Sequence, residues 1–302
     1  MQYCLIFFFF CMLIFPEIVV LGASKGLVLW FNNILPTLLP FMIISNLIIN
    51  TKAIDLLVKW FSPLFCRLFH VSRYGVFAVV CGFFCGYPMG SKVTCDLLAN
   101  NYITFNEAKY LLSFCNNTSP MFIISFIMIQ NLDCRSLILS SVLILYLSPV
   151  ICSFIFRKIY HINSDMYNSI SYNSKCSPYC SGLFDSCIMN AFEMITKVGG
   201  YIMIFSILVG LSQLLPFNDS LASTFFRSLF EISSGINILS GSAFSFSTRY
   251  TLCMFLASFG GWCAIAQTKS IIAPYRISIF PYTIEKLVTA VVTSLLTLVI
   301  QL

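Results

Sequence analysis

The sequence contains few charged side chains, and this scarcity excludes most classes of soluble protein. Charged residues make up 9% of the 302 positions, whereas hydrophobic residues make up 59%. In an ordinary soluble domain about a quarter of the residues are charged. A soluble fold of this length could not hide so much apolar surface from water. The composition therefore predicts a protein whose solvent is the hydrocarbon of a membrane.

Motifs typical of catalysis are also missing. The chain has no G-x-x-x-x-G-K-[ST] and no H-E-x-x-H, and histidine occurs only twice. These absences argue against an ATP-driven pump and a zinc protease. Because an intramembrane enzyme would need a nucleophile and a base within reach of each other, we expect no enzymatic activity and no catalytic residues.

The 14 cysteines and the net charge of +6 point neither to a metal nor to nucleic acid. Most cysteines lie inside apolar runs, where they behave as small hydrophobic residues. Cys176 and Cys180 share a polar loop, but no histidine lies beside them, so we expect no metal and no cofactor. The lysines and arginines are scattered singly, which predicts topology signals rather than a nucleic-acid surface.

What the sequence does contain is a series of long apolar stretches. A helix needs about 20 mostly apolar residues to cross about 30 Å of hydrocarbon. The pattern predicts an all-α fold, a polytopic transmembrane helical bundle with about eight membrane segments in contact with the lipid bilayer. The stretches, most of them uncharged, cover residues 4–22, 26–50, 74–91, 110–132, 136–156, 198–218, 250–268 and 277–302.

A polar interval rich in Ser, Asn and Tyr divides the chain. We predict an N-terminal transmembrane helix at residues 1–25, a first half at 26–160, a polar connector at 161–185 and a second half at 186–302.

The two halves show weak signs of duplication. Pro40 and Gly200 occupy matching places, as do Gly86 and Gly261, which predicts a two-fold internal repeat. Membrane segments interrupted by Gly and Pro are typical of secondary transporters, in which broken helices meet near the membrane midplane. Since non-helical backbone at that depth needs protein or trapped water around it, the breaks predict an internal polar site.

The basic residues favour one or two re-entrant or broken-helix hairpins. If residues 74–91 enter the membrane and return, the basic residues that follow lie on the same, cytoplasmic side as Lys52 to Arg73, as the positive-inside rule requires. Residues 232–248, rich in Ser and Gly, are the second candidate for such a hairpin. The basic residues placed on this side are Arg157, Lys158, Lys269, Arg276 and Lys286.

The densest motif is GFFCGYPMGSK at residues 82–92. Such a loop exposes amide groups that could meet an anionic or hydroxylated solute, and Lys92 could supply charge. An alternative is equally open: the glycines let helices pack closely, and Lys92 extends to the membrane interface. The residues predicted here to bind a solute are Gly86, Tyr87, Pro88, Gly90 and Lys92.

A second motif consists of four hydrogen-bonding side chains in front of Pro120, inside an apolar run. Burying two adjacent amides is costly unless they are paired. We predict that the block faces a solute, although it could instead bond a neighbouring helix or the carbonyl that Pro120 frees. We also expect Asn116 and Lys92 to belong to one functional site. The predicted solute-binding residues of this block are Asn116, Asn117, Thr118 and Ser119.

A third motif, GGWCAIAQTK at residues 260–269, lies in the second half. Gly260, Gly261 and Gln267 are its predicted site residues. The amide of Gln267 offers two donors and one acceptor, which suits a nucleobase or sugar edge. Glu231 is a further acidic candidate.

Thr104 and Glu107 have a different pattern, that of a helix-capping box. In such a box the Thr side chain accepts a hydrogen bond from the amide three residues on. We therefore predict a structural rather than a functional role for Glu107.

Together these motifs resemble the sporulation integral membrane protein YlbJ family of endospore-forming Firmicutes. That family is similar to the nucleoside-recognition or Gate domain proteins, which include the membrane gate of ferrous-iron transporters and relatives of nucleoside permeases. The second glycine motif of the family carries Ser and His where this chain has Cys263 and Ile265, so one polar contact is lost there. The likeness rests on LWFNNILPTLLPF from Leu29, GYPMGSK from Gly86, NEAKYLLSFCNNTSPMFIIS from Asn106, GGYIMIFS from Gly199, LFEISSGI from Leu229 and FGGWCAIAQ from Phe259.

The resemblance implies two Gate-like halves and a role in spore formation. It also implies a transporter or gate for a small polar solute, nucleoside-like or ionic, with a midplane site and a possible coupling ion. A multi-pass location in the mother-cell or forespore membrane follows, and a homo-oligomer is possible. The alternative is a structural or assembly protein of the developing spore membranes, in which the same motifs only pack helices.

The charge pattern predicts that residues 161–185 face the cytoplasm, because Arg157, Lys158 and Lys175 outnumber the two acids there. A membrane-impermeant thiol reagent added to intact cells should therefore leave Cys176 and Cys180 unlabelled. Strong labelling of either from outside would contradict the re-entrant assignment of residues 74–91.

Overall fold

The computed structural model describes residues 2–51, 53–162, 182–214 and 220–301, and every regular element in these ranges is a helix. The all-α prediction is therefore confirmed. Within these ranges, five helices are long and apolar enough to cross a membrane, so the chain is a multi-pass membrane protein. They cover Pro16–Ile49, Arg135–Ile159, Leu183–Ser212, Phe246–Tyr275 and Ile279–Gln301.

The predicted number of about eight membrane segments is not confirmed. Beside the five long helices, the described chain has three apolar helices of only 10–17 residues, at Leu5–Ile14, Gly75–Phe84 and Phe122–Asn131. At 1.5 Å per residue such helices reach about 15–25 Å and do not cross the hydrocarbon alone.

The N-terminal helix predicted at residues 4–22 is broken in two. Helix α1 (Gln2–Ile14) ends before Phe15, whose φ of −121° and ψ of 58° are not helical, and α2 (Pro16–Leu29) begins directly after it. Proline has no amide hydrogen and disfavours a helical residue before it, so Pro16 opens a new helix.

Helix α2 does not end at residue 25. It continues through the π-helical turn η1 (Trp30–Ile34) into α3 (Leu35–Ile49), giving one apolar span of 34 residues. The predicted boundary between residues 25 and 26 therefore lies inside a continuous helix. Gly22 and Gly26 lie on the face of α2 that packs on α9 (Leu183–Ser212), where a Cβ on Gly26 would come within 2.9 Å of backbone.

After α4 (Ala53–Phe69), the chain forms a helical hairpin, an interrupted helix and a continuous helix. The hairpin is α5 (Gly75–Phe84) with α6 (Met89–Ala99), the interrupted helix is α7 (Phe105–Cys115) with η2 (Phe122–Asn131), and the continuous one is η3 (Arg135–Leu137) with α8 (Ile138–Ile159).

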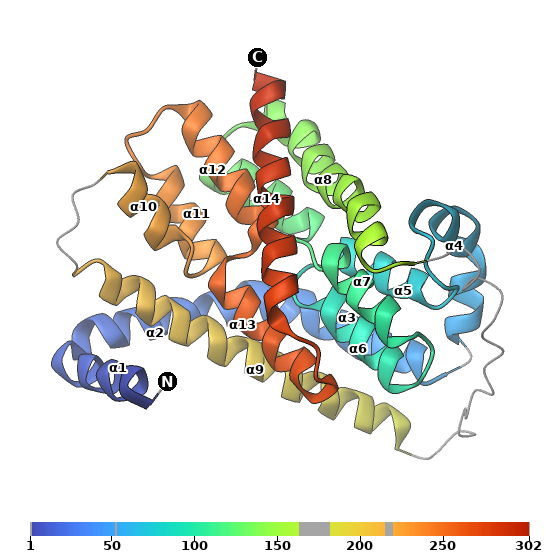
Figure 1. Ribbon diagram of the computed structural model, residues 1–302. Coiled ribbons are helices and arrows are strands. Elements are labelled where there is room, and N and C mark those ends of the chain that lie inside the picture. Colours follow the sequence, from blue (N-terminus) through green and yellow to red (C-terminus); the bar gives the residue numbers. More distant parts are fainter. Residues whose placement is uncertain (1, 52, 163–181, 215–219, 302) are drawn as a thin grey trace.

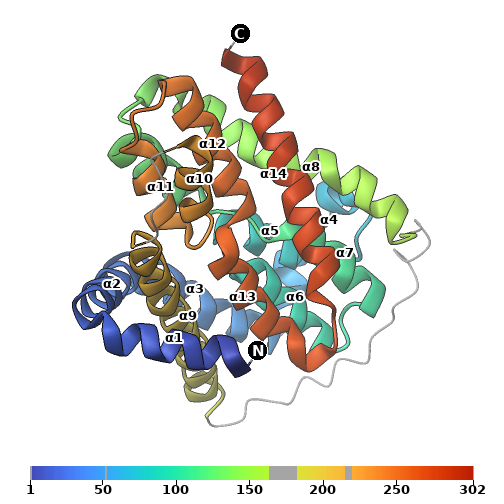
Figure 2. The same cartoon turned by 60° about the vertical axis from the view of Figure 1, so that its left-hand side comes forward.

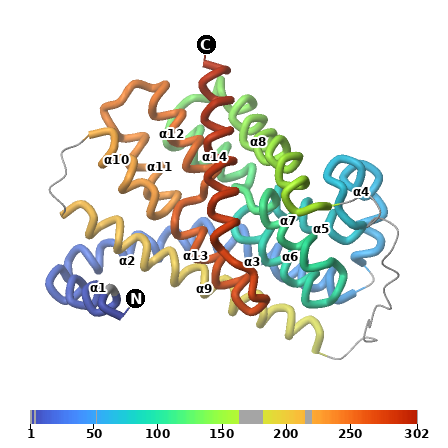
Figure 3. The backbone as a smooth tube through the Cα atoms, in the orientation of Figure 1, coloured from blue at the N-terminus to red at the C-terminus, as the bar shows by residue number. Residues whose placement is uncertain are grey.

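The same three kinds of element follow α9. They are α10 (Leu221–Ser228) with α11 (Ile232–Ser240), then α12 (Phe246–Phe259) with α13 (Gly261–Ile272) and η5 (Ala273–Tyr275), and finally α14 (Ile279–Gln301). Figure 1 shows α14 at the centre beside α8, with α2 and α9 lying together across the base of the molecule. The turned view of Figure 2 and the tube of Figure 3 show the same arrangement.

The predicted equivalence of Gly86 and Gly261 does not match these elements. Gly86 lies in the turn of a hairpin, whereas Gly261 begins the second part of an interrupted helix. Both motifs are rich in glycine because main chain packs against main chain at both places. A hairpin turn and a helix break therefore have similar sequences although they are different elements.

Residues 163–181 of the predicted connector, with Cys176 and Cys180, lie outside the described residues. Helix α9 begins at Leu183, two residues before the connector was predicted to end.

The predicted cap of α7 is confirmed, since the Thr104 hydroxyl accepts from the Glu107 amide at 3.2 Å. The Glu107 side chain is buried, and its Oε1 accepts from the Ser72 amide at 2.6 Å. Burial raises the pKa of this carboxyl, although the bond from Ser72 opposes the shift. Glu107 thus ties the start of α7 to the segment before α5, a structural role.

Two glycines allow the α5–α6 hairpin to pack closely against the end of α7. A Cβ on Gly82 would lie 1.7 Å from the carbonyl oxygen of Cys115, and a Cβ on Gly90 would lie 2.2 Å from the same oxygen. No side chain fits at these distances, so both arms of the hairpin require glycine here.

Gly82→Ala should therefore destabilise the protein by several kcal/mol, because the backbone of α5 and α7 must separate. Gly200→Ala is the matched control: Gly200 also lies within a helix, but nothing lies within 4 Å of its Cβ position. We expect Gly82→Ala to lower membrane abundance and melting temperature in nanodiscs, and Gly200→Ala to change neither or to raise both slightly. Equal behaviour of the two variants would contradict this packing.

Candidate functional site

The first helix break lies between α7 and η2, at residues 116–119, which adopt no regular structure. Asn116, Asn117 and Thr118 are all buried. The turn of the first hairpin packs against this break, since a Cβ on Gly86 would lie 3.0 Å from the Ser119 amide nitrogen. The structure thus brings together the first two motifs that the sequence singled out.

The second break lies between α12 and α13, where Gly260 and Gly261 have φ of +87° and +77°. Residues other than glycine rarely adopt such angles. Beyond them, the amides of Trp262 and Cys263 donate to the carbonyls of Leu229 (2.8 Å) and Phe230 (2.9 Å), in the turn between α10 and α11. Each hairpin turn therefore packs against the break in the interrupted helix that follows it.

Glu231 begins α11 and is buried. Its Oε1 accepts from the Ser233 amide at 2.9 Å, and its Oε2 accepts from the Ser234 amide at 2.7 Å. The carboxylate thereby caps the helix N-terminus, where negative charge is stabilised.

Tyr87 connects the two breaks. Its hydroxyl, in the first hairpin turn, donates to the carbonyl of Ser258 at 2.8 Å. Its ring lies against Gly260, where a Cβ would approach the ring to 2.8 Å.

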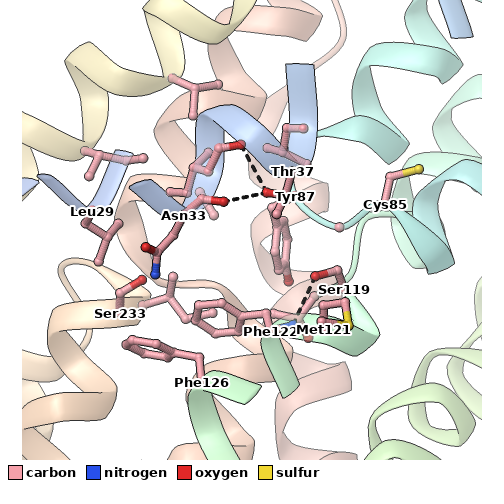
Figure 4. Close-up of a pocket in the computed structure, with 18 of the residues that line it drawn as sticks. Leu29, Asn33, Thr37, Cys85, Tyr87, Ser119, Met121, Phe122, Phe126 and Ser233 are labelled. Atoms are coloured by element: carbon pink, nitrogen blue, oxygen red, sulfur yellow. Dashed lines mark hydrogen bonds between the residues drawn. The ribbon is translucent and has the colours of Figure 1, made fainter. Parts of the chain in front are cut away.

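A cavity of about 570 Å³ lies where the hairpin turns, the breaks and the middle of the span formed by α2, η1 and α3 meet. Figure 4 shows its walls, with Asn33 and Thr37 on one side and Tyr87, Ser119 and Phe122 on another. Among the described lining residues, Glu231 is the one acidic residue, none is basic, and the others are apolar or neutral polar. Of the predicted site residues, those that line it are Gly86, Tyr87, Thr118, Ser119, Gly260 and Gln267.

Several polar lining residues were not predicted as site residues, and three of them, Asn32, Asn33 and Thr37, lie on the long span. They are exposed on a helix that is otherwise apolar enough to span a membrane. The adjacent side-chain amides of Asn32 and Asn33 could have indicated a site, because polar side chains deep in a membrane face protein or a cavity.

Cys263 also lines the cavity, and its sulfur accepts from the Gln267 side chain at 3.3 Å. Ile265 lies in an apolar cluster instead. Of Cys263 and Ile265, only Cys263 therefore lines the cavity.

Asn116 and Asn117 lie outside the cavity lining, in a polar network that joins the first break to α14. The Asn116 side-chain nitrogen donates to the hydroxyls of Tyr282 (2.8 Å) and Thr268 (3.1 Å). The ammonium of Lys286 donates to the main-chain oxygen of Asn116 (2.9 Å) and to Oδ1 of Asn117 (3.3 Å).

Lys286 was predicted to flank the membrane, and this placement is wrong. The residue is 1% exposed and lies inside the spanning helix α14. Thr289, Thr293 and Thr297 follow it on the same buried face at spacings of three and four. This row of polar residues on one helix face indicates that Lys286 faces the protein interior. A count of basic residues near the membrane ends does not take helix faces into account.

Lys92 does not join Asn116. It forms an ion pair with Asp96 one turn along α6, and its ammonium lies 3.5 Å from Oδ1 of Asn46. Pro88, Gly90 and Gly261 also lie outside the cavity lining. The expected cation beside the Asn block is therefore present, but Lys286 supplies it.

Comparison with curated proteins gives one informative relative. The chain is 25% identical over 303 residues to the sporulation integral membrane protein YlbJ of Bacillus subtilis (strain 168), a match that covers 89% of this chain and 74% of the relative. This similarity confirms the resemblance that the motifs indicate. No family model matches the chain, and no solved structure matches it.

Replacing Asn116 should damage the protein more than replacing Lys92. Asn116→Leu removes the side-chain donor to the hydroxyls of Tyr282 and Thr268 and should cost about 1–3 kcal/mol, seen as lower membrane abundance and melting temperature. Lys92→Arg keeps the ion pair with Asp96, lies off the cavity and should change stability by less than about 0.5 kcal/mol. Loss of function in Lys92→Arg at normal abundance would instead assign Lys92 to the site.

Proposed function

We propose that this chain, a relative of YlbJ-type sporulation membrane proteins, is a transporter or gate for a small polar solute, nucleoside-like or ionic. The cavity of about 570 Å³ at the meeting point of two hairpin turns and two helix breaks is the observation that carries the proposal. A volume of this size accommodates a small molecule.

The location of the cavity supports movement across the membrane rather than binding at its surface. The lining residues 29–41 lie around the middle of the 34-residue span Pro16–Ile49. A site at mid-height can be reached from either side by small movements of the elements around it.

The walls suit a solute with hydrogen-bonding groups on several edges. Neutral polar side chains come from three directions: Asn33 from the long span, Ser119 from the first break and Gln267 from α13. An amide can both donate and accept, so these groups would match a heterocycle or a polar ring.

The repeated order of hairpin, interrupted helix and continuous helix supports the two-fold repeat predicted from the sequence. We infer that the α5–α6 and α10–α11 hairpins are equivalent, as are the two interrupted helices. In this scheme the two halves contribute one hairpin turn and one break each to the cavity.

A role in sporulation comes from the relative, whose name describes a sporulation integral membrane protein. We propose the mother-cell or forespore membrane as the location of this chain. A structural or assembly role in those membranes is the second candidate, and there the breaks would serve packing alone.

Substitutions in the cavity separate the two candidates. Asn33→Leu and Gln267→Leu keep side-chain volume but remove hydrogen bonding, so they should lower solute uptake into vesicles at least tenfold while membrane abundance stays normal. Thr196→Val is the control, because Thr196 is exposed on α9 and lies outside the lining.

The assay uses labelled nucleosides, polar heterocyclic acids and amino acids with the purified protein in vesicles. Complementation of sporulation in a strain that lacks its YlbJ-type protein gives a second readout. Full complementation by both Leu variants at wild-type abundance would reject the transport proposal and favour assembly.

A further inference from the structure

The amine of Lys286 lies at the end of a half-helix inside the protein. Helix α7 ends at Cys115, and the next main-chain oxygen, that of Asn116, accepts from the Lys286 ammonium at 2.9 Å. The C-terminal end of a helix carries partial negative charge from its unpaired carbonyls. A cation is therefore stabilised at this position even without a carboxylate.

Every partner of this ammonium in the described chain is neutral. Oδ1 of Asn117 accepts from it at 3.3 Å, and the ring centroid of Tyr87 lies 5.1 Å away. The neighbouring Glu285 instead accepts from the hydroxyl of Tyr160. The ion pairs among the described residues are Lys92–Asp96 and Lys197–Glu193, and neither includes Lys286.

Neutral oxygens at an unwound helix end are the ligands with which membrane proteins bind alkali cations. An aromatic face adds attraction for a small cation. Moreover, the site has an unused acceptor, because Oδ1 of Asn116 is buried without a hydrogen-bond partner. The surroundings of Lys286 thus have the composition of a monovalent-cation site.

We propose that the Asn116–Asn117 break is a monovalent-cation site that the chain fills with its own lysine. The Lys286 ammonium takes the place of a free Na⁺, K⁺ or NH₄⁺ ion. It keeps the unwound carbonyls paired in every state of the protein. If the proposed transport function holds, solute movement then needs no free alkali cation at this break.

The test removes the tethered cation and offers free ones. Purified full-length Lys286→Ala in nanodiscs is melted in chloride salts of Na⁺, K⁺, NH₄⁺ or N-methylglucamine at constant ionic strength. We expect it to melt several degrees below wild type in N-methylglucamine and to recover, with saturation, in at least one of the three small cations. Wild type should melt alike in all four salts.

Lys197→Ala controls for general effects of losing a lysine. Lys197 is exposed on α9 and pairs with Glu193, so its removal should produce no cation-specific shift. A saturable recovery confined to Lys286→Ala supports the proposal, and the same response of both variants to the four salts overturns it.

Lys286→Met keeps the test decisive if Lys286→Ala does not accumulate. Methionine has nearly the volume of lysine but no charge, so it fills the space and leaves the oxygens without a cation. Under the proposal this variant is also low in abundance, and no salt restores it. Wild-type abundance of Lys286→Met would overturn the proposal, since packing alone would then suffice. The melting readout does not depend on transport, so failure of uptake and failure of the cation site are observed separately.

Discussion

The structure depends on one constraint: main-chain groups freed by breaks in membrane helices must find polar partners inside the protein. Each unpaired group in hydrocarbon costs several kcal/mol, so a break survives only where something meets it. At the second break the amides of Trp262 and Cys263 meet carbonyls of a hairpin turn. At the first break the carbonyl of Asn116 meets the ammonium of Lys286. The two breaks are thus stabilised by opposite chemistry, donors in one case and an acceptor in the other.

This constraint explains why glycine is concentrated where it is. The hairpin turns must approach the breaks closely enough for main chain to contact main chain. At the end of α7, for example, the carbonyl oxygen of Cys115 leaves no room for a side chain at Gly82 or Gly90. The same close approach brings Tyr87 across to the carbonyl of Ser258, so that the first hairpin also supports the second break. The cavity is the space that remains where these backbones diverge. Packing and a binding site are therefore consequences of one arrangement, and a glycine in this region can serve both.

Much of this arrangement could be predicted from the sequence, because it follows from composition and from breaks in apolar runs. The membrane class, the helical fold and the convergence of residues 82–92 with 116–119 were predictable in this way. The break at Phe15 was missed because an average over residues 4–22 hides the effect of Pro16. The equivalence of Gly86 and Gly261 failed because glycine marks close approach without saying whether the element is a turn or a break.

The lysine that contacts the Asn116 break could not be predicted from the sequence either. Lys92 follows the glycine motif directly and was the natural partner for Asn116, yet it pairs with Asp96 on its own helix. Lys286, which lies 170 residues after Asn116 in the sequence, reaches the break instead. A sequence gives the register of one helix but not which face of a distant helix meets it, so nearness along the chain does not identify the partner. Depth in the membrane is the better guide: a lysine two turns inside a spanning helix must find partners there, whereas one at the end of a short helix can reach water or a nearby carboxylate.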